Sequence, residues 1–278
     1  MMVKKIIIGL ILVLILVFLG INLKNQFVPK IALINIKGVI SSYKETLQYL
    51  SIAEKDSSIK AVVLNVDSPG GAVGASQEIY RAIEKIRKKK PVIVSMGNVA
   101  ASGGYYISAA ANVIYANPGT ITGSIGVIVQ HIDITELTKK LGIKITNIKS
   151  GKNKDILYPN HKLKPEEKRL IEQTVKDVYE QFLDAVVKYR NIDKKKLRPY
   201  ADGRIFSGRQ ALKIGLVDKL GNLQDAIAEA RKMIGKQGSA AIVVEIGKEK
   251  SLFEKLFGAK INVDMLDNLS GIYYLMTF

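Results

Sequence analysis

Residues 60–71, KAVVLNVDSPGG, pass from a run of aliphatic residues into a turn rich in proline and glycine. The run is continuously apolar, which is typical of a strand buried on both faces of a parallel sheet. Residues 76–90, SQEIYRAIEKIRKKK, follow with isoleucines at helical spacing, and residues 91–99, PVIVSMGNV, are a second apolar run. Strand, loop, helix and strand in this order predict an α/β fold with a mostly parallel sheet.

The alternation continues on both sides of this unit, which indicates one catalytic domain over residues 27–278 with no tandem repeat. The tail from about residue 249 has no clear role; its FEKLF segment could lie on a membrane or, more in keeping with its pattern, be buried in an oligomer. Further strands are expected at 30–40, within VIYANPG and ITGSIGVIVQHIDI, and at 143–149, and further helices at 41–56, 102–112, around TELTKKL, at 164–190 and at 222–234.

The N-terminus carries a candidate membrane span. MMVKK precedes residues 6–23, IIIGLILVLILVFLGINL, which is about the length of roughly 20 apolar helical residues that crosses a bilayer. The run passes into NLKNQFVPK without the small residues of a cleavage site, so residues 1–26 are interpreted as an uncleaved signal anchor. Lysines flank the run on both sides, so charge alone does not orient it.

The composition excludes several classes of chemistry. The 278 residues include no cysteine, which excludes disulfides, a thiol nucleophile and thiolate-bound zinc, and the two histidines, His131 and His161, offer little for a metal site. The net charge of +17 lies in lysine runs that lack interleaved aromatics or a nucleic-acid-binding module. Solvated helix ends or attraction to anionic lipid explain these runs better than nucleic-acid binding does.

Two short segments could carry chemistry. Residues 67–71, DSPGG, follow a predicted strand, where ligands collect in parallel sheets, and their backbone N–H groups could face an oxyanion. Ser102 lies between an alanine pair and a glycine pair at the start of a predicted helix. The ordinary alternatives are a glycine turn for the first segment and a helix N-cap for the serine.

A serine nucleophile needs a base, and the residues alone leave its identity open. His131 with Asp133 two residues on is one option, although a structural histidine is the more ordinary interpretation. A lysine is the other, but it acts as a base only when burial or positive neighbours lower its pKa from about 10.4 towards neutrality. Because the chain has 42 basic residues, spacing alone cannot choose one.

Five motifs follow one another along the chain: DSPGG (67–71), AASGGYYISAAAN (100–112), ITGSIGV (121–127), SGKNKDILYP (150–159) and DGRIFSGRQALKIGLVD (202–218). In this order they closely resemble the signal peptide peptidase A (SppA) family of membrane-bound serine proteases, over about residues 30–235. The chain has one copy of the set, as in the short form of that family. The resemblance implies an α/β fold of the crotonase and Clp protease type.

The resemblance also implies the site residues. The family's nucleophile falls on Ser102 and its general base on Lys154, with Lys152 as the local rival. A further family serine, which holds the lysine amine, falls on Ser124. The oxyanion hole would consist of the N–H groups of Gly70 and Gly103, and no metal or cofactor is needed.

In such enzymes the lysine removes the serine proton, an acyl-enzyme forms, and water releases the product. The resemblance implies signal peptides and other apolar or unfolded peptides as substrates, a homo-oligomeric ring in which each subunit supplies both serine and lysine, and a cytoplasmic N-terminus with the protease outside. The segment 202–218 would serve packing and assembly. Alternatives are a stomatin-type membrane-protein-directed protease, an acyl-thioester enzyme of the same fold, and a catalytically silent membrane-anchored scaffold.

Overall fold

The computed structural model describes residues 28–247 and 272–275. The signal anchor expected at residues 1–26 and the FEKLF segment of the tail lie outside these residues. Within the described part, no helix combines the length and the apolar character that a bilayer span requires.

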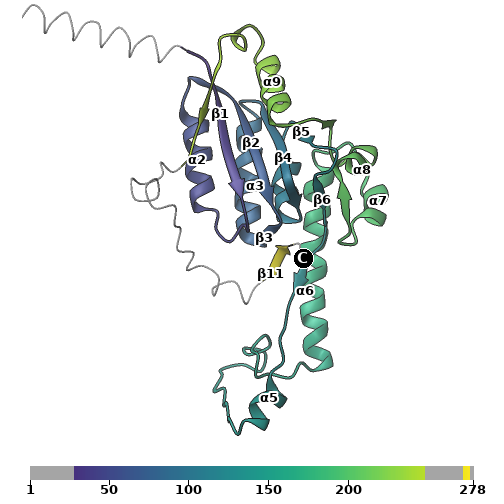
Figure 1. Cartoon of the computed structure of the whole chain (residues 1–278). Coiled ribbons are helices and arrows are strands. Elements are labelled where there is room, and N and C mark those ends of the chain that lie inside the picture. The colour runs from purple at the N-terminus through teal and green to yellow at the C-terminus, as the bar shows by residue number, and fades with distance from the viewer. Residues whose placement is uncertain (1–27, 248–271, 276–278) are drawn as a thin grey trace, which may run out of the picture.

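The domain is built on a mostly parallel sheet, as the alternating pattern predicted (Figure 1). Its path runs β10-β1-β2-β4-β5-β9, and all of these neighbours are parallel. The first half of β4 pairs with β5 and its last residues pair with β6, which in turn pairs antiparallel with β8. The strands are β1 (Lys30–Lys37), β2 (Ile59–Ser68), β4 (Val92–Ala101), β5 (Val113–Ala116), β6 (Ile121–Gly123), β8 (Ile205–Ser207), β9 (Lys219–Leu220) and β10 (Ile242–Glu245).

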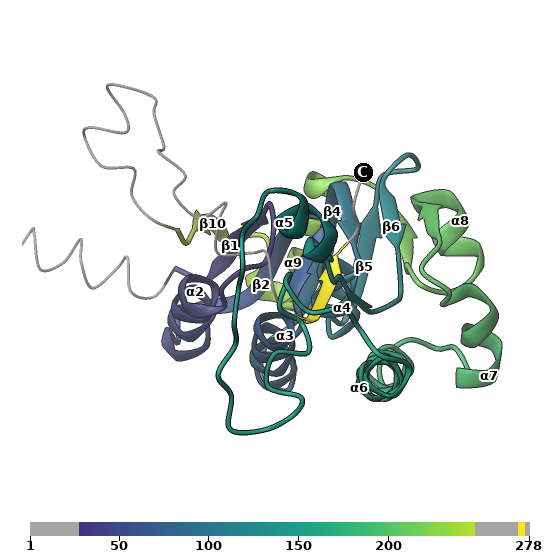
Figure 2. The same ribbon diagram turned by 90° about the horizontal axis from the view of Figure 1, so that it is seen from below.

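Helices cover both faces of the sheet, so alternate residues of each central strand are buried on opposite sides. On one face, Val62 and Leu64 of β2 join a core formed with α2, α3, α4 and α6; on the other, Ala61 and Val63 pack in a smaller cluster with α9. Figure 2 shows α2, α3 and α6 side by side below the sheet. The helices are α2 (Lys44–Lys55), α3 (Val73–Arg87), α4 (Gly103–Ala109), α6 (Pro165–Val187), α7 (Lys194–Leu197), α8 (Gly208–Lys213) and α9 (Leu223–Met233), with 3-10 turns at Arg198–Tyr200 and Gly235–Gln237.

A second, smaller sheet lies at the carboxyl edge of the large one. Its order is β3-β11-β7, formed by β3 (Gly70–Ala72), β11 (Ile272–Leu275) and β7 (Ile128–Val129). Strand β11 is antiparallel to both neighbours, with Tyr274 opposite Gly71 and Tyr273 opposite Ile128. A segment close to the C-terminus therefore lies directly beside the DSPGG loop.

Residues 130–163, which we call the arm, project beyond this edge of the domain beside the N-terminal end of α6 (Figure 1). The arm contains α5 (Thr135–Lys140), where a short helix was predicted. The strand predicted at residues 143–149 is wrong: this segment pairs with no described strand, and Ile148 is 100% exposed. Isoleucines at 143 and 145 satisfy a strand pattern, but only a neighbouring strand supplies the hydrogen bonds of a sheet.

Candidate active site

The ends of three adjacent parallel strands bring together the predicted site residues other than Lys154. In the sheet register, Ser68 of β2 lies opposite Ala100 of β4, and Ala101 lies opposite Gly123 of β6. Gly70, Ser102 and Ser124 each follow within two residues of these pairs, so they lie at one edge of the sheet. This edge is formed by the carboxyl ends of the strands, which is where parallel α/β sheets bind their ligands.

Ser102 occupies a strained turn between β4 and α4. Its φ of 52° and ψ of −116° lie where residues other than glycine are rare, and the residue is only 1% exposed. Its backbone N–H donates to the carbonyl of Gly123 at 2.8 Å, and its carbonyl accepts from the N–H of Tyr106 at 2.7 Å. The hydroxyl does not cap α4 and receives no hydrogen bond from any described residue, so the N-cap interpretation does not hold. A strained serine at a strand-to-helix turn is the geometry of a nucleophile elbow.

Ser124 repeats this pattern on the neighbouring strand. Its φ is 49°, it is 8% exposed, and it follows Gly123, whose φ is 78°. In the described residues, Ser102 and Ser124 are the two non-glycine residues with positive φ. The strain in the domain is therefore concentrated at two serines on adjacent strand ends.

The segment 202–218 supports both serine turns. The carbonyl of Arg204 accepts from the N–H of Ser124 at 2.9 Å. The carbonyl of Leu216 accepts from the hydroxyl of Tyr105, which is fully buried and directly follows the glycine pair after Ser102. These contacts hold α4 and the Ser124 turn against the same segment of the chain, residues 202–218.

The proposed oxyanion donors differ in their present partners. Gly103 is the first residue of α4, where backbone N–H groups have no acceptor within the helix. The N–H of Gly70 donates to Oγ of Ser68 at 3.1 Å, and Gly70 has a φ of 107°. To donate to an oxyanion, the Gly70 N–H must either bond the oxyanion and the Ser68 hydroxyl at once, or the Ser68 hydroxyl must rotate away.

Small residues let the two loops approach closely. A Cβ placed on Gly104 would lie 2.6 Å from the carbonyl oxygen of Ser68, and one on Gly71 would lie 2.2 Å from that of Ile40. Real Cβ atoms do not approach backbone oxygens so closely. Gly71 and Gly104 are thus required by the close packing of the DSPGG loop against the segment after β1 and against α4, besides any role in binding.

The structure does not bring Lys154 to Ser102 within the chain. Lys154 is exposed on the arm, in a series of turns that includes its N–H donating to the carbonyl of Gly151 at 3.1 Å. In the described part of the chain, its ammonium has no hydrogen-bond or ion-pair partner. Lys152 lies on the same turns and is also exposed.

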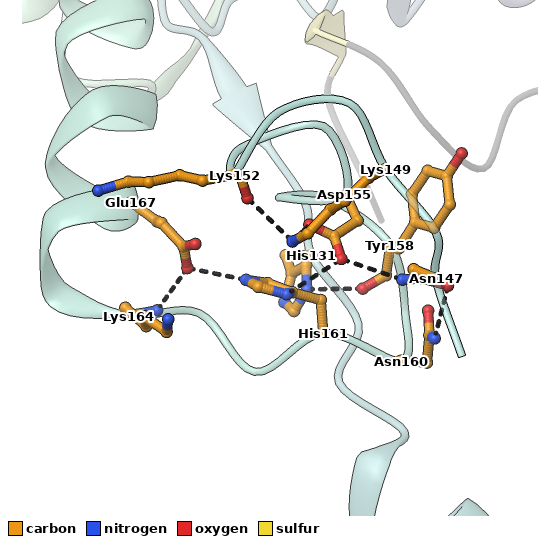
Figure 3. Close-up of polar contacts among 10 residues, drawn as sticks. All are labelled: His131, Asn147, Lys149, Lys152, Asp155, Tyr158, Asn160, His161, Lys164 and Glu167. Atoms are coloured by element: carbon orange, nitrogen blue, oxygen red, sulfur yellow. Dashed lines mark hydrogen bonds and ion pairs between the residues drawn. The ribbon is translucent and has the colours of Figure 1, made fainter. Parts of the chain in front are cut away.

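A polar network that the sequence did not predict lies around these turns (Figure 3). The carboxylate of Asp155 accepts from Nζ of Lys149 and, at 3.1 Å, from Nδ2 of Asn147. The His161 ring lies between two carboxylates, with Nδ1 3.7 Å from Asp155 and Nε2 2.8 Å from Oε2 of Glu167. The sequence could not predict this network, because the spacing of its aspartate and histidine matches no common motif. The one signal in the sequence was that Asp155 directly follows Lys154.

The histidine alternative for the base finds no support in this geometry. Nε2 of His131 lies 3.2 Å from the carbonyl oxygen of Tyr158, within the arm. Asp133 accepts from the N–H and the hydroxyl of Thr135 at the start of α5. Across residues 28–247 and 272–275, no three histidine, aspartate or glutamate side chains are grouped so as to hold a metal ion.

Comparison with known proteins gives this arrangement a context. The sequence model of peptidase family S49 matches residues 84–237. A Synechocystis protein described as a protease is 41% identical over 249 residues, which cover 88% of this chain and 90% of the relative. A signal peptide peptidase, SppA, described in Enterococcus faecium is 37% identical over 238 residues, which cover 81% and 69%.

The fold is also found among solved structures. A membrane-bound stomatin-specific protease superposes with a TM-score of 0.52 and 18% identity, over 80% of this chain and 99% of that chain. At this identity the likeness concerns the fold alone.

Proposed function

The chain belongs to peptidase family S49 and is a serine protease, and from that premise we propose that it degrades cleaved signal peptides and other apolar or unfolded peptides with Ser102 as nucleophile and Lys154 as general base. The observation that carries the proposal is the conformation of Ser102: a buried serine in a strained strand-to-helix turn with no hydrogen bond to its hydroxyl from the described residues. A packed fold retains such strain mainly at functional sites.

The proposed reaction proceeds through an acyl-enzyme. The neutral amine of Lys154 takes the hydroxyl proton as Oγ of Ser102 attacks the peptide carbonyl, and the N–H groups of Gly70 and Gly103 stabilise the oxyanion. The ammonium then protonates the leaving amine as the peptide C–N bond breaks. Lys154 next takes a proton from water, which attacks the ester, and the Ser102 hydroxyl is restored. Ser124, on the neighbouring strand end, holds the lysine amine.

We infer that Ser102 of one copy of the chain meets Lys154 of a neighbouring copy. Lys154 lies on an arm that projects beyond the carboxyl edge of the sheet, and the arm exposes Ile143, Ile145 and Ile148. Exposed apolar side chains on a protruding segment are typical of a protein interface. In a homo-oligomeric ring, each subunit would then supply its serine to one site and its lysine to the next.

The substrate would bind as an added strand. Strand β11 lies between β3 and β7 and is antiparallel to both, directly beside Gly70 and Gly71. An extended peptide in this position would be held by backbone hydrogen bonds on both sides, which recognise a peptide without regard to its sequence. A peptide bound there must displace residues 272–275.

The apolar N-terminal run would place this site at a membrane surface. Residues 6–23 would anchor the chain with its N-terminus in the cytoplasm and the catalytic domain outside, where signal peptides released into the bilayer are within reach.

Peptidase activity of the full-length chain tests the proposal. A quenched apolar peptide is offered to wild type, Ser102→Ala, Lys154→Ala and the matched control Lys152→Ala, which removes an exposed lysine of the same turns. We expect cleavage by wild type and the control, and loss by the other two with oligomer size unchanged. Full activity of Ser102→Ala would refute the nucleophile; equal loss in both lysine variants would refute the choice of base.

Mixing the two inactive variants tests the shared site. Mixed rings of Ser102→Ala and Lys154→Ala subunits contain some sites with both native groups if the groups come from different subunits. We expect activity to return after the mixed chains are dissociated and reassembled. A mixture that forms rings and stays inactive would place both groups of each site in one subunit.

A further inference from the structure

The arm is held together by a charged residue instead of an apolar core. Between residues 130 and 163, Asp155 is the one buried residue, with 6% of its surface exposed, and the isoleucines of the segment are mainly exposed. Burying a carboxylate is unfavourable unless hydrogen bonds and opposite charges compensate it. The conformation of the arm therefore depends on the partners of Asp155.

Those partners come from both sides of Asp155 in the sequence. The ammonium of Lys149 and the amide of Asn147 donate to its two carboxylate oxygens, and the His161 ring faces it from the other side (Figure 3). The hydrogen bonds from Lys149 and Asn147 lower the pKa of the Asp155 carboxyl to about 2. The carboxylate is thus fully ionised at neutral pH and can act as a permanent anchor.

Lys149 fastens the turn that carries Lys154 at two points. Its ammonium donates to the carbonyl of Lys152 at 2.9 Å as well as to Asp155. Lys154 lies between these two attachment points, and its own N–H is bonded to the carbonyl of Gly151. The backbone of Lys154 is therefore fixed on both sides, while its side chain remains exposed and available.

A second connection joins this turn to the body of the domain. The His161 ring contacts Glu167, which also accepts from the N–H of Lys164 at 2.9 Å at the start of α6. These two bonds hold the pKa of the Glu167 carboxyl below its usual value. Helix α6 is anchored further along by Phe182 in the main core, which also includes α4 directly after Ser102.

We propose that Asp155 is a positioning residue for the reaction: together with Lys149 it fixes the turn that presents Lys154, and through His161 and Glu167 it fixes that turn to α6. The inference rests on the proposed role of Lys154 as general base. Proton transfer needs donor and acceptor within hydrogen-bond reach, and a misplacement of about 1 Å can cost on the order of a hundredfold in rate.

The experiment compares near-isosteric variants of the full-length chain in the quenched-peptide assay, with oligomer size and thermal unfolding measured on each. Asp155→Asn and Lys149→Met remove the charge pair, and Lys149→Arg keeps a cation at the same place. The matched control is Asp133→Asn, which changes an exposed arm carboxylate that, among the described residues, accepts hydrogen bonds only from Thr135.

We expect Asp155→Asn and Lys149→Met each to lower kcat by about tenfold to a hundredfold with KM within about twofold, because the network touches the base and not the peptide. The double variant should be less impaired than the product of the two single effects predicts, because the two changes share the Lys149–Asp155 interaction. Lys149→Arg should recover most of the lost kcat, and the control should match wild type.

The outcomes separate this inference from the proposed function. Wild-type kcat in Asp155→Asn, while Lys154→Ala is inactive, would overturn the positioning role and leave the base assignment standing. Full activity of Lys154→Ala would overturn both. If Asp155→Asn disrupts assembly, the Lys149 pair decides: equal loss in Lys149→Met and Lys149→Arg, with rings intact, would refute a role for the charge pair.

Discussion

Replacing Gly104 by alanine should damage the active site without touching any group that takes part in the reaction. The new Cβ would lie 2.6 Å from the Ser68 carbonyl oxygen, whereas ordinary contact begins at 3.4 Å, so α4 and the DSPGG loop must separate by the difference of 0.8 Å. Gly104 and the Ser68 carbonyl both belong to buried backbone, so neither can rotate away as a flexible side chain would. Because Ser102 directly precedes α4 and Gly70 lies in the opposing loop, this separation changes the distance between the nucleophile and the proposed oxyanion donor.

We expect kcat/KM to fall on the order of a hundredfold, as a displacement near 1 Å does in other enzymes. Overpacking of this kind also destabilises a fold by about 1–3 kcal/mol, which corresponds to a fall in Tm of about 2–12 °C for a domain of this size. The assays are peptide cleavage and thermal unfolding of the full-length chain.

Gly74→Ala is the matched control. Gly74 is also helical, in α3, and a Cβ built on it meets nothing within 4 Å. Alanine favours helix over glycine by up to about 1 kcal/mol, so this variant should be active and at least as stable as wild type. The reasoning is refuted if Gly104→Ala keeps both wild-type kcat/KM and wild-type Tm; a lower Tm with unchanged kcat/KM would show close packing that does not position the nucleophile.

Strain at Ser102 predicts that Ser102→Gly, although inactive, is about 1 kcal/mol more stable than Ser102→Ala in denaturant unfolding, because glycine accepts a φ of 52° without strain; equal stabilities would contradict the strain. The pKa of Asp155 is about 2 against an ordinary 3.8, so its contribution to ordering the arm is complete above 3.8 and is lost as the pH falls towards 2. Hydrogen-exchange protection of residues 151–161 should fall across that window in wild type and stay flat in Asp155→Asn; parallel curves would exclude Asp155 as the cause. Asp218→Ala should cost about 2 kcal/mol of unfolding free energy, because it removes the carboxylate 2.6 Å from the buried Arg190 guanidinium; an unchanged midpoint in urea would show that the other acceptor of this guanidinium, the carbonyl of Ala111 at 2.6 Å, suffices.

Much of the fold followed from the sequence because its central strands are apolar on both sides and its helices are periodic. The adjacency of Ser102 and Ser124 also follows from general rules, since each comes directly after a parallel strand and such ends lie at one edge. That these turns would be strained was not visible, because the strain depends on backbone angles set by packing. The motifs pointed to the residues, and the register of β4 with β6 placed them side by side.

The arm could not be predicted in the same way. Its isoleucines at 143, 145 and 148 suggested a strand. A strand needs a neighbouring strand, however, and the sequence does not show whether one lies beside this segment. The buried carboxylate of Asp155 has partners six residues away on either side, at a spacing that matches no regular element. The return of β11 to the DSPGG loop is a long-range contact of the same kind, which local pattern does not encode.

Covalent labelling of the nucleophile tests the central claim most directly. The full-length chain is treated with a fluorophosphonate, which reacts with activated serines, and the modified peptide is located by mass spectrometry. The account predicts one adduct, on Ser102, that is absent from Ser102→Ala and forms slower by on the order of a hundredfold or more in Lys154→Ala. An adduct on another residue, or labelling of Lys154→Ala at the wild-type rate, would contradict it.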